Sequence, residues 1–203
     1  VKNNVSGTAM LLDTIVNGDF PIKKLIVAAS NTIYGEGLYS CPDCGDQSPS
    51  IRLVEQLDQK KWELLCPECG KELTHKPTPE TKKLDSNNIY SLTKKYQEEL
   101  CMSTGKTYGI PIVSLRYFNV YGPRQSLSNP YTGVAAIFTS RIKNNNPPYI
   151  YEDGLQTRDF VHVDDIARAN LLAMETSNAN YQCINVGTQV STTIKDLAER
   201  LIA

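Results

Sequence analysis

Lys24–Ala29, with the sequence KLIVAA, is a short apolar run between Pro21 and the polar, glycine-bearing segment Ser30–Gly37. Its length and apolar character suit a strand that is buried on both faces of a parallel sheet. The segment Ser30–Gly37 is then the loop at the C-terminal end of that strand. We therefore take this stretch as one strand of a layered α/β domain.

The same alternation of patterns extends along the chain. Apolar spacing predicts helices over Asn4–Val16, Asn88–Lys106 (ended near Gly105) and Val134–Lys143, a fourth from a cap at Asp164 or Asp165 through Met174, and a fifth from Thr192 onward. Further strands are expected at Ile110–Tyr117, Tyr149–Tyr151, Arg158–Val163 and Gln182–Val186. Strands that alternate with helices indicate an α/β fold with a mainly parallel sheet.

The composition is that of an ordinary globular protein. Of 203 residues, 40% are hydrophobic and 21% are charged, and the formal net charge is −1. No basic excess points to nucleic acid, and no apolar run of about 18 residues predicts a membrane span. The first residues lack the pattern of a secretory signal. We therefore expect a cytoplasmic protein without a nucleic-acid or membrane partner.

Four of the six cysteines form two C-x-x-C pairs, Cys41 with Cys44 and Cys66 with Cys69, and each pair is followed by glycine. This spacing is typical of a four-cysteine zinc ribbon, in which the thiolates close a tetrahedral structural site. The alternative is two unbridged or redox-active pairs. We expect a zinc ribbon inserted at residues 38–75.

A small core is expected inside the ribbon. Trp62 and Leu64 are its candidate core residues, and a core this small would depend on the metal for its fold. Cys101 and Cys183 have no partner in the sequence pattern, so they are expected to be buried apolar side chains.

Tyr90 and Lys94 are four residues apart in a predicted helix, which places them on one face, one turn apart. A tyrosine has a pKa of about 10 in water, and a nearby ammonium group favours the phenolate form. Such a pair can take a proton from a sugar hydroxyl. Alone the pattern is weak, because an exposed helix pair gives the same spacing.

Five further sequence segments, in a fixed order along the chain, accompany the Tyr90 and Lys94 pair. They are Asn4–Thr8 (NVSGT), Val27–Gly35 (VAASNTIYG), Leu115–Arg124 (LRYFNVYGPR), Thr157–Ala167 (TRDFVHVDDIA) and Asn185–Gly187 (NVG). Together with Tyr90 and Lys94 they resemble the extended short-chain dehydrogenase/reductase family, whose members include NAD-dependent nucleotide-sugar epimerases and dehydratases. The resemblance implies a partial Rossmann-like, doubly wound parallel sheet with part of a small substrate domain.

The resemblance also implies roles for individual residues. Ser30, Tyr90 and Lys94 would be the catalytic set, and they would contact NAD together with Asn4 and Phe118. A nucleotide-diphosphate sugar would be bound by Asn119 and Arg158, with Tyr151 against its base. Phe118 and Tyr151 can also be read as plain core or surface aromatics. The family further implies a homodimer formed through the Tyr90 helix and its neighbour.

The chain departs from the family pattern in three ways. The glycine-rich loop that binds the NAD pyrophosphate is not present, so we expect these residues alone to be inactive. Asn31 and Thr32 follow Ser30, where family dehydratases carry an acidic pair, which favours a 4-epimerase. The ribbon lies between Ser30 and Tyr90, which resembles the family branch acting on dTDP-L-rhamnose.

Two alternatives to an epimerase remain open from the sequence. A nucleotide-sugar 4,6-dehydratase or a 4-keto reductase would use the same residues. A non-catalytic zinc-ribbon binding protein would use only the ribbon. The expected domains are residues 1–37 and 76–130 for the NAD-binding part, 38–75 for the ribbon, and 131–203 for the substrate part with returning Rossmann segments.

Overall fold

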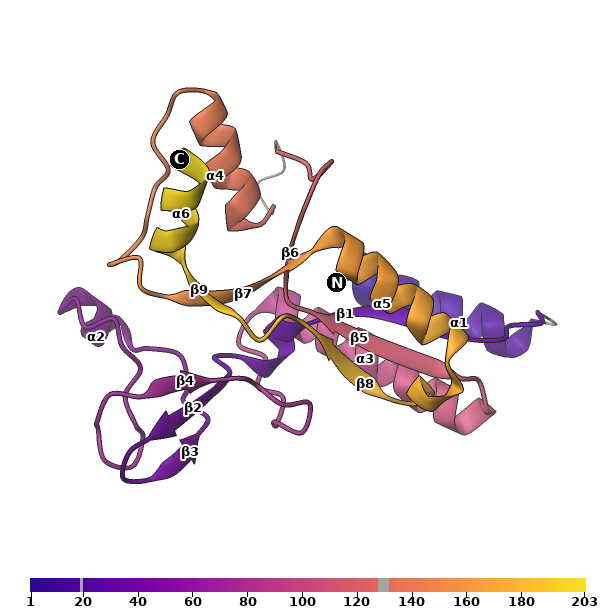
Figure 1. Cartoon of the computed structure of the whole chain (residues 1–203). Helices are drawn as coiled ribbons and strands as arrows, with labels where there is room; N and C mark the ends of the chain where they lie inside the picture. Colours follow the sequence, from indigo (N-terminus) through magenta and orange to yellow (C-terminus); the bar gives the residue numbers. More distant parts are fainter. Residues whose placement is uncertain (19, 128–131) are drawn as a thin grey trace.

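The computed structural model describes residues 1–18, 20–127 and 132–203, and Figure 1 shows their arrangement. The helical elements are η1 (Lys2–Gly7), α1 (Thr8–Asn17), η2 (Asn31–Tyr34), α2 (Val54–Asp58), α3 (Ile89–Tyr108), α4 (Val134–Lys143), α5 (Val163–Glu175), η3 (Ser177–Ala179) and α6 (Ile194–Ile202). The strands are β1 (Leu25–Ser30), β2 (Leu38–Cys41), β3 (Gly45–Gln47), β4 (Thr74–Lys76), β5 (Ile112–Tyr117), β6 (Asn119–Tyr121), β7 (Thr157–His162), β8 (Cys183–Val186) and β9 (Ser191–Thr193). None of the described helices is both long and apolar enough to cross a membrane.

The predicted parallel sheet is confirmed, with strand order β1, β5, β8. The register pairs Leu25 with Ile112 and Ser30 with Tyr117, so β1 and β5 end together at one edge of the sheet. Ile112 and Val113 are fully buried, as expected of a strand covered on both faces.

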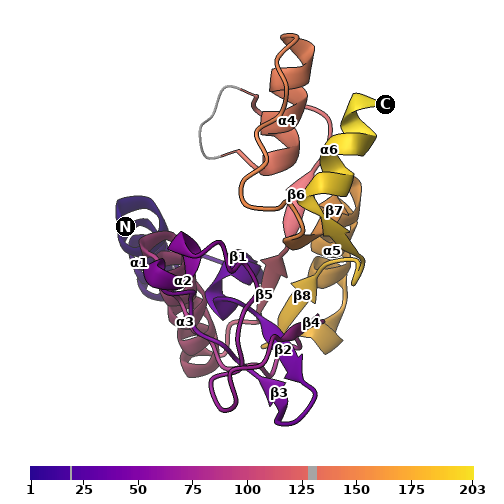
Figure 2. The same cartoon turned by 90° about the vertical axis from the view of Figure 1, so that its left-hand side faces the viewer.

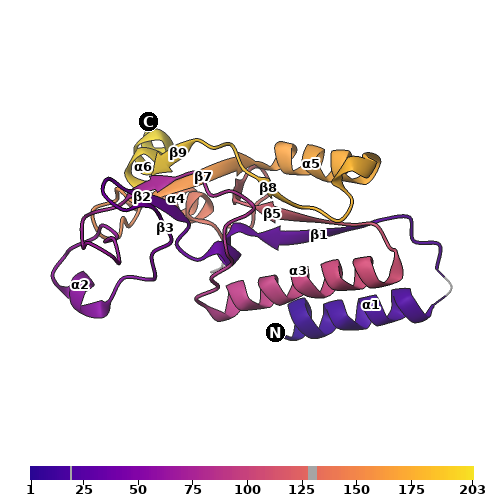
Figure 3. The same cartoon turned by 90° about the horizontal axis from the view of Figure 1, so that it is seen from below.

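Helices cover both faces of this sheet. Figure 3 shows α1 and α3 on one side of β1 and β5, and α5 on the other. Side chains of α1, α3 and the strands form one buried cluster, which contains Leu12, Val27, Cys101, Met102 and Ile112. Cys101 is buried there, and the partly buried Cys183 packs against it, in agreement with the apolar role expected for both.

Helix α3 continues past Gly105 and ends at Gly109, so the end predicted near Gly105 is wrong. A Cβ at Gly105 would lie 2.8 Å from the Ile110 carbonyl oxygen and 2.8 Å from the Ile112 side chain. Glycine is used at this position for close helix-to-strand contact. Gly109 supplies the left-handed cap, with φ of 69°.

Two other sequence-based expectations are corrected by local chemistry. His162 caps α5, because its ring Nδ1 accepts the Asp164 N–H at 3.3 Å, so neither Asp164 nor Asp165 is the cap. Both aspartates lie instead in the first turn, where the helix dipole favours negative charge.

The strand expected at Tyr149–Tyr151 does not form. Pro147 and Pro148 just before it have no backbone N–H to donate to a neighbouring strand. The Tyr149 ring stacks instead against Arg141, whose guanidinium carbon lies 3.7 Å from the ring centroid. The segment is therefore held by a cation–π contact and not by a sheet.

Two smaller sheets extend from the carboxyl edge of the parallel sheet. Strands β3, β2 and β4 form an antiparallel sheet within the cysteine-bearing segment. Strands β6, β7 and β9 form the other, and Figure 2 shows α4 and α6 beyond it. The domain boundary expected between residues 130 and 131 lies outside the described residues.

Candidate functional site

A cavity of about 860 Å³ lies between these three sheets. It is lined by residues of η2 after β1, of the start and return of the cysteine-bearing segment, of the turn before α3, of the segment after β5, of the start of β7 and of the end of β8. Open α/β sheets bind ligands outside the carboxyl ends of their parallel strands, which is where this cavity lies. The cavity is therefore the candidate substrate site. The predicted catalytic residues Ser30, Tyr90 and Lys94 are not among its lining residues, although Asn31, next to Ser30, and Asn88, the cap of α3, are.

Ser30 is the last residue of β1 and caps the short helix η2. Its Oγ accepts hydrogen bonds from the Thr32 backbone N–H at 3.3 Å and from the Thr32 hydroxyl at 3.0 Å. The serine proton itself is therefore free to be donated to a third group. Asn31 and Thr32 line the cavity.

Helix α3 carries Tyr90 and Lys94 and begins with a capping box. The Asn88 side chain accepts the Ser91 N–H at 2.9 Å, and the Ser91 hydroxyl accepts the Asn88 N–H at 3.1 Å. Tyr90, two residues after the cap, is 53% exposed. Its ring is therefore available to a ligand.

Lys94 ties α3 to the strand that ends at Ser30. Its Nζ donates to the Ala28 carbonyl at 2.8 Å and to Gln97 Oε1 at 3.0 Å, which leaves the third of its three protons free. Burial lowers the pKa of this ammonium group below its usual value. Sequence-predicted Ser30, Tyr90 and Lys94 thus lie on two contacting elements.

Asn4 is held against the same helix, because its Nδ2 donates to the Thr93 hydroxyl at 3.0 Å. Phe118 and Asn119 follow β5 and line the cavity. Phe118 packs against Gly187, where an added Cβ would approach the Phe118 ring to 3.2 Å. The same Cβ would lie 2.7 Å from Asp159 Oδ2, so a side chain at this position would force its neighbours to shift.

Arg158 on β7 lines the opposite side of the cavity. Its guanidinium donates to the Thr157 carbonyl at 2.7 Å and to Gln156 Oε1 at 3.1 Å. No carboxylate of the described residues pairs with it, so its charge is available to an anion. Tyr151 does not line the cavity and is 76% exposed.

A buried polar network beneath the cavity was missed by the sequence analysis. Arg116 makes a bidentate pair with Glu98, with N–O distances of 2.6 and 3.0 Å, and donates to the Tyr34 hydroxyl at 2.6 Å. Tyr34 in turn donates to Asn185 Oδ1 at 2.8 Å. An arginine inside an otherwise apolar strand was the signal that could have found it.

Burial shapes the electrostatics of this network. It raises the pKa of the Tyr34 phenol, although Arg116 opposes the rise. Burial by itself lowers the pKa of Arg116, but the hydrogen bonds and charge of Glu98 outweigh this and raise it. The network therefore holds one fixed charge pair between α3, which carries Lys94, and β5, which leads into Phe118 and Asn119.

The four cysteines of the two C-x-x-C pairs converge in the folded chain. The Sγ atoms of Cys41, Cys44, Cys66 and Cys69 all lie within 4.8 Å of one another, and Cys41 Sγ is 3.5 Å from Cys69 Sγ. A disulfide would need about 2.05 Å, whereas zinc–thiolate bonds of about 2.3 Å separate tetrahedral sulfurs by roughly 3.8 Å. The cluster has the donor set and spacing that fit a zinc ion.

The core of the cysteine-bearing segment matches only part of the expectation. Leu64 is buried, together with Leu73, Cys41 and Cys66, whereas Trp62 is not part of this cluster. The Trp62 carbonyl instead accepts a hydrogen bond from Arg52 at 2.8 Å. The sequence pattern could not separate these roles, because both side chains are apolar.

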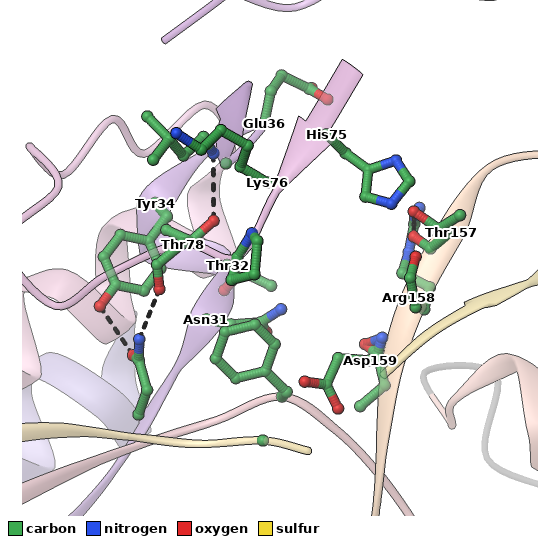
Figure 4. Close-up of a pocket in the computed structure, with 18 of the residues that line it drawn as sticks. Asn31, Thr32, Tyr34, Glu36, His75, Lys76, Thr78, Thr157, Arg158 and Asp159 are labelled. Atoms are coloured by element: carbon green, nitrogen blue, oxygen red, sulfur yellow. Dashed lines mark hydrogen bonds between the residues drawn. The ribbon is translucent and has the colours of Figure 1, made fainter. Parts of the chain in front are cut away.

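The cavity also has lining residues that the sequence analysis did not single out. Tyr39 on β2 and His75 on β4 belong to the cysteine-bearing segment and also line the cavity. Figure 4 shows His75 on the same side of the view as Thr157 and Arg158, with Tyr34 and Thr78 on the other side. No motif marks these two residues, because only the folded segment brings them to the site.

Residues 66–187 match the family model described as the NAD dependent epimerase/dehydratase family. This match covers more than half of the chain, and the chain belongs to that family. Its α/β fold with a parallel sheet is the Rossmann-type fold of these enzymes, as the resemblance had implied.

Individual relatives agree with this assignment. The chain is 32% identical over 204 aligned residues to dTDP-L-rhamnose 4-epimerase of Burkholderia thailandensis, covering 98% of this chain and 53% of the relative. It is 31% identical to the solved UDP-glucose 4-epimerase of Thermotoga maritima with UDP-glucose, with a TM-score of 0.74 over 98% of this chain and 52% of that one.

A third protein is solved with two ligands. This is UDP-glucuronic acid 4-epimerase of Bacillus cereus in complex with UDP-glucuronic acid and NAD, which is 27% identical. Its TM-score is 0.71, over 99% of this chain and 51% of that one. The chain therefore spans about half the length of the relatives that it matches.

Proposed function

We propose that the complete protein is an NAD-dependent nucleotide-sugar 4-epimerase with Ser30, Tyr90 and Lys94 as its catalytic set. The observation that carries the proposal is the 2.8 Å hydrogen bond from Lys94 to the Ala28 carbonyl on β1. It joins the helix of Tyr90 to the strand that ends at Ser30. Membership of the epimerase/dehydratase family supports this assignment.

Each catalytic residue has a separate task. Tyr90 takes the proton of the sugar C4 hydroxyl, and the Lys94 ammonium favours the phenolate that does so. Ser30 donates its free proton to the reacting oxygen, because its lone pairs already accept from Thr32. The 4-keto sugar turns over in the cavity, and Tyr90 returns the proton when the opposite face is reduced.

The residues present fit the nicotinamide end of NAD, which supplies the hydride acceptor and donor when bound. Lys94 keeps one free proton for a ribose hydroxyl. Asn4 in η1 is held by its hydrogen bond to Thr93 of α3, and Phe118 lies beside Gly187. A family member solved with NAD supports the same cofactor.

The substrate is proposed to be a nucleotide-diphosphate sugar held by Asn119 and Arg158. The guanidinium of Arg158 has no carboxylate partner among the described residues and lies in the cavity wall, which suits a diphosphate. The relative that acts on dTDP-L-rhamnose supports that sugar as the first candidate. The contact between Tyr151 and the base stays a prediction.

Epimerisation is favoured over 4,6-dehydration by the residues next to Ser30. Asn31 and Thr32 line the cavity there, and neither supplies an acid to drive water elimination. A 4,6-dehydratase would instead release a 4-keto-6-deoxy sugar. Detection of that product would replace the epimerase proposal within the same family.

We interpret residues 38–75 as a zinc ribbon inserted in the NAD-binding part, with Cys41, Cys44, Cys66 and Cys69 as ligands. Four thiolates leave no coordination position for water, so the role of the metal is structural. Burial by itself raises the pKa of the Cys41 thiol, but hydrogen bonds from the backbone N–H groups of Asp43 and Cys44 outweigh this and lower it to about 7. A homodimer formed through α3 and α1 is proposed from the family.

The test uses the full-length gene product with NAD, followed by proton NMR at sugar C4 with dTDP-L-rhamnose and UDP-glucose. Tyr90→Phe is expected to lower kcat at least ~100-fold, because the proton acceptor is lost. Tyr108→Phe, an exposed tyrosine at the other end of the same helix, is the matched control. Full activity of Tyr90→Phe would reject the mechanism.

A further inference from the structure

The cysteine-bearing segment contributes a strand pair to the cavity. Tyr39 on β2 lies opposite His75 on β4 in the antiparallel register, so the two side chains share one face. Both residues line the cavity, whereas their neighbours Ser40 and Thr74 do not. Leu38 and Lys76, the next pair along these strands, also line the cavity, so this end of the strand pair borders the ligand site.

The polar groups of this strand pair have no partner in the described part of the chain. Neither the Tyr39 hydroxyl nor the His75 ring forms a hydrogen bond with another described residue, although Tyr39 is half-buried. His75 is exposed and the Tyr39 hydroxyl is not a buried unpaired atom, so both groups are open to solvent and to a ligand. Phenol and imidazole can each donate and accept, which is what the hydroxyl groups of a sugar require.

A second contact ties the cysteine-bearing segment to the far side of the cavity. Arg52 makes a bidentate pair with Glu152 at 2.8 and 2.9 Å, and the same guanidinium also donates to the Trp62 carbonyl. Glu152 has a φ of 58°, which is uncommon for residues other than glycine, asparagine and aspartate. The pair therefore joins the segment before α2 to the loop that precedes β7.

We propose that the cysteine module, residues 38–75, is a wall of the ligand site, in which Tyr39 and His75 contact the sugar of the bound nucleotide sugar. The Arg52–Glu152 pair holds this wall against the substrate side. The inference rests on the proposed substrate class and adds the residues that select the sugar.

The geometry gives the wall a task distinct from the catalytic set. Arg158 carries the charge that suits a diphosphate, and Asn31 and Thr32 lie next to the catalytic serine. Tyr39 and His75 add a phenol and an imidazole to the cavity wall, which can recognise hydroxyls, and Figure 4 shows His75 near Thr157. The module thus determines which sugar fits, while the parallel sheet supports the chemistry.

The test is equilibrium binding by calorimetry to the full-length protein loaded with NAD. The probes are dTDP-L-rhamnose and UDP-glucose, with dTDP and UDP as sugar-free references. His75→Ala and Tyr39→Phe are each expected to weaken nucleotide-sugar binding about 3- to 10-fold, the loss of one hydrogen bond, and to leave dTDP and UDP binding unchanged.

Thr74→Ala is the matched control, because it lies next to His75 on β4 and does not line the cavity. It is expected to bind all four probes as the wild type does. Zinc content and Trp62 emission check that each variant keeps the folded module. Wild-type affinities in both His75→Ala and Tyr39→Phe would overturn the inference.

The binding measurement tests the ligand wall, and inversion at C4 tests the proposed reaction, so failure of one can be told from failure of the other. Binding that depends on His75 without inversion at C4 would reject the epimerase and keep the ligand wall. Inversion at C4 with unchanged binding in the module variants would keep the epimerase and reject the wall.

Discussion

The parallel sheet and the cysteine module face the same cavity but are stabilised in different ways. The sheet buries Ile112, Val113 and Leu115 between helices on both faces. The module buries a cluster of only four residues, which are Cys41, Leu64, Cys66 and Leu73. Two of these four are proposed metal ligands, so we propose that apolar burial stabilises the sheet, whereas a bound metal stabilises the module.

The same contrast holds for ion pairs. Arg116–Glu98 in the sheet region and Arg52–Glu152 at the module are both bidentate. The side chains of the first pair are 6% and 3% exposed, and those of the second are 24% and 21% exposed. The same kind of arginine–glutamate pair thus lies in a buried and in a more exposed environment. We expect the loss of the buried pair to lower the free energy of unfolding more.

Metal removal has the largest expected effect, confined to the module. Structural zinc sites contribute on the order of 10 kcal/mol, so a chelator or Cys66→Ser is expected to unfold the module. Trp62, the only tryptophan, lies in the module and reports this by its emission, while far-UV circular dichroism reports the helices of the sheet region. We expect the emission to shift to the red and the dichroism to change little.

The control for this experiment is Cys183→Ala, at a cysteine outside the cluster. It is expected to keep about one zinc per chain by metal analysis. Unchanged Trp62 emission after complete metal removal would show that the module folds without a metal, and the comparison with the sheet would fail.

The second prediction sharpens the contrast between the ion pairs. Arg116→Met is expected to destabilise the sheet region by about 3–5 kcal/mol, because it leaves the Glu98 carboxylate buried without its partner. Arg52→Met, the matched variant, is expected to cost about 0–1 kcal/mol, because Glu152 can turn to solvent. Urea unfolding followed by circular dichroism measures both. Equal costs would contradict the difference in environment.

The smallest effect is expected where the module returns to the sheet region, at the start of α3. Asn88→Ala removes one half of the capping box and is expected to destabilise the fold by about 0.5–2 kcal/mol. The same urea measurement applies, with Thr81→Ala, an exposed residue of the return segment, as the control. A cost no greater than that of Thr81→Ala would show that the cap does not support α3.

The main elements could be predicted from the sequence because their patterns are local. The run KLIVAA forms a parallel strand, β1, and the two C-x-x-C pairs converge, as their spacing indicated. Two predictions about helix ends were wrong, at Gly105 and at His162. Gly105 is a contact glycine and His162 is a cap, and neither role is visible without the residues that these two positions meet.

The candidate site was predicted only in part. Phe118, Asn119 and Arg158 were expected at the site and line the cavity. Tyr39 and His75 were not expected there, because no motif marks them. Their position depends on a strand register between residues far apart in sequence.

The sequence by itself determined the family, the parallel sheet, and the candidate catalytic and metal-binding residues, because each depends on residue type and spacing within short segments. Only the tertiary structure decided which long-range partners meet. It paired Arg116 with Glu98, tied Arg52 to Glu152, and turned the module toward the cavity. These contacts depend on burial and on strand register across the fold, which short-range patterns do not encode.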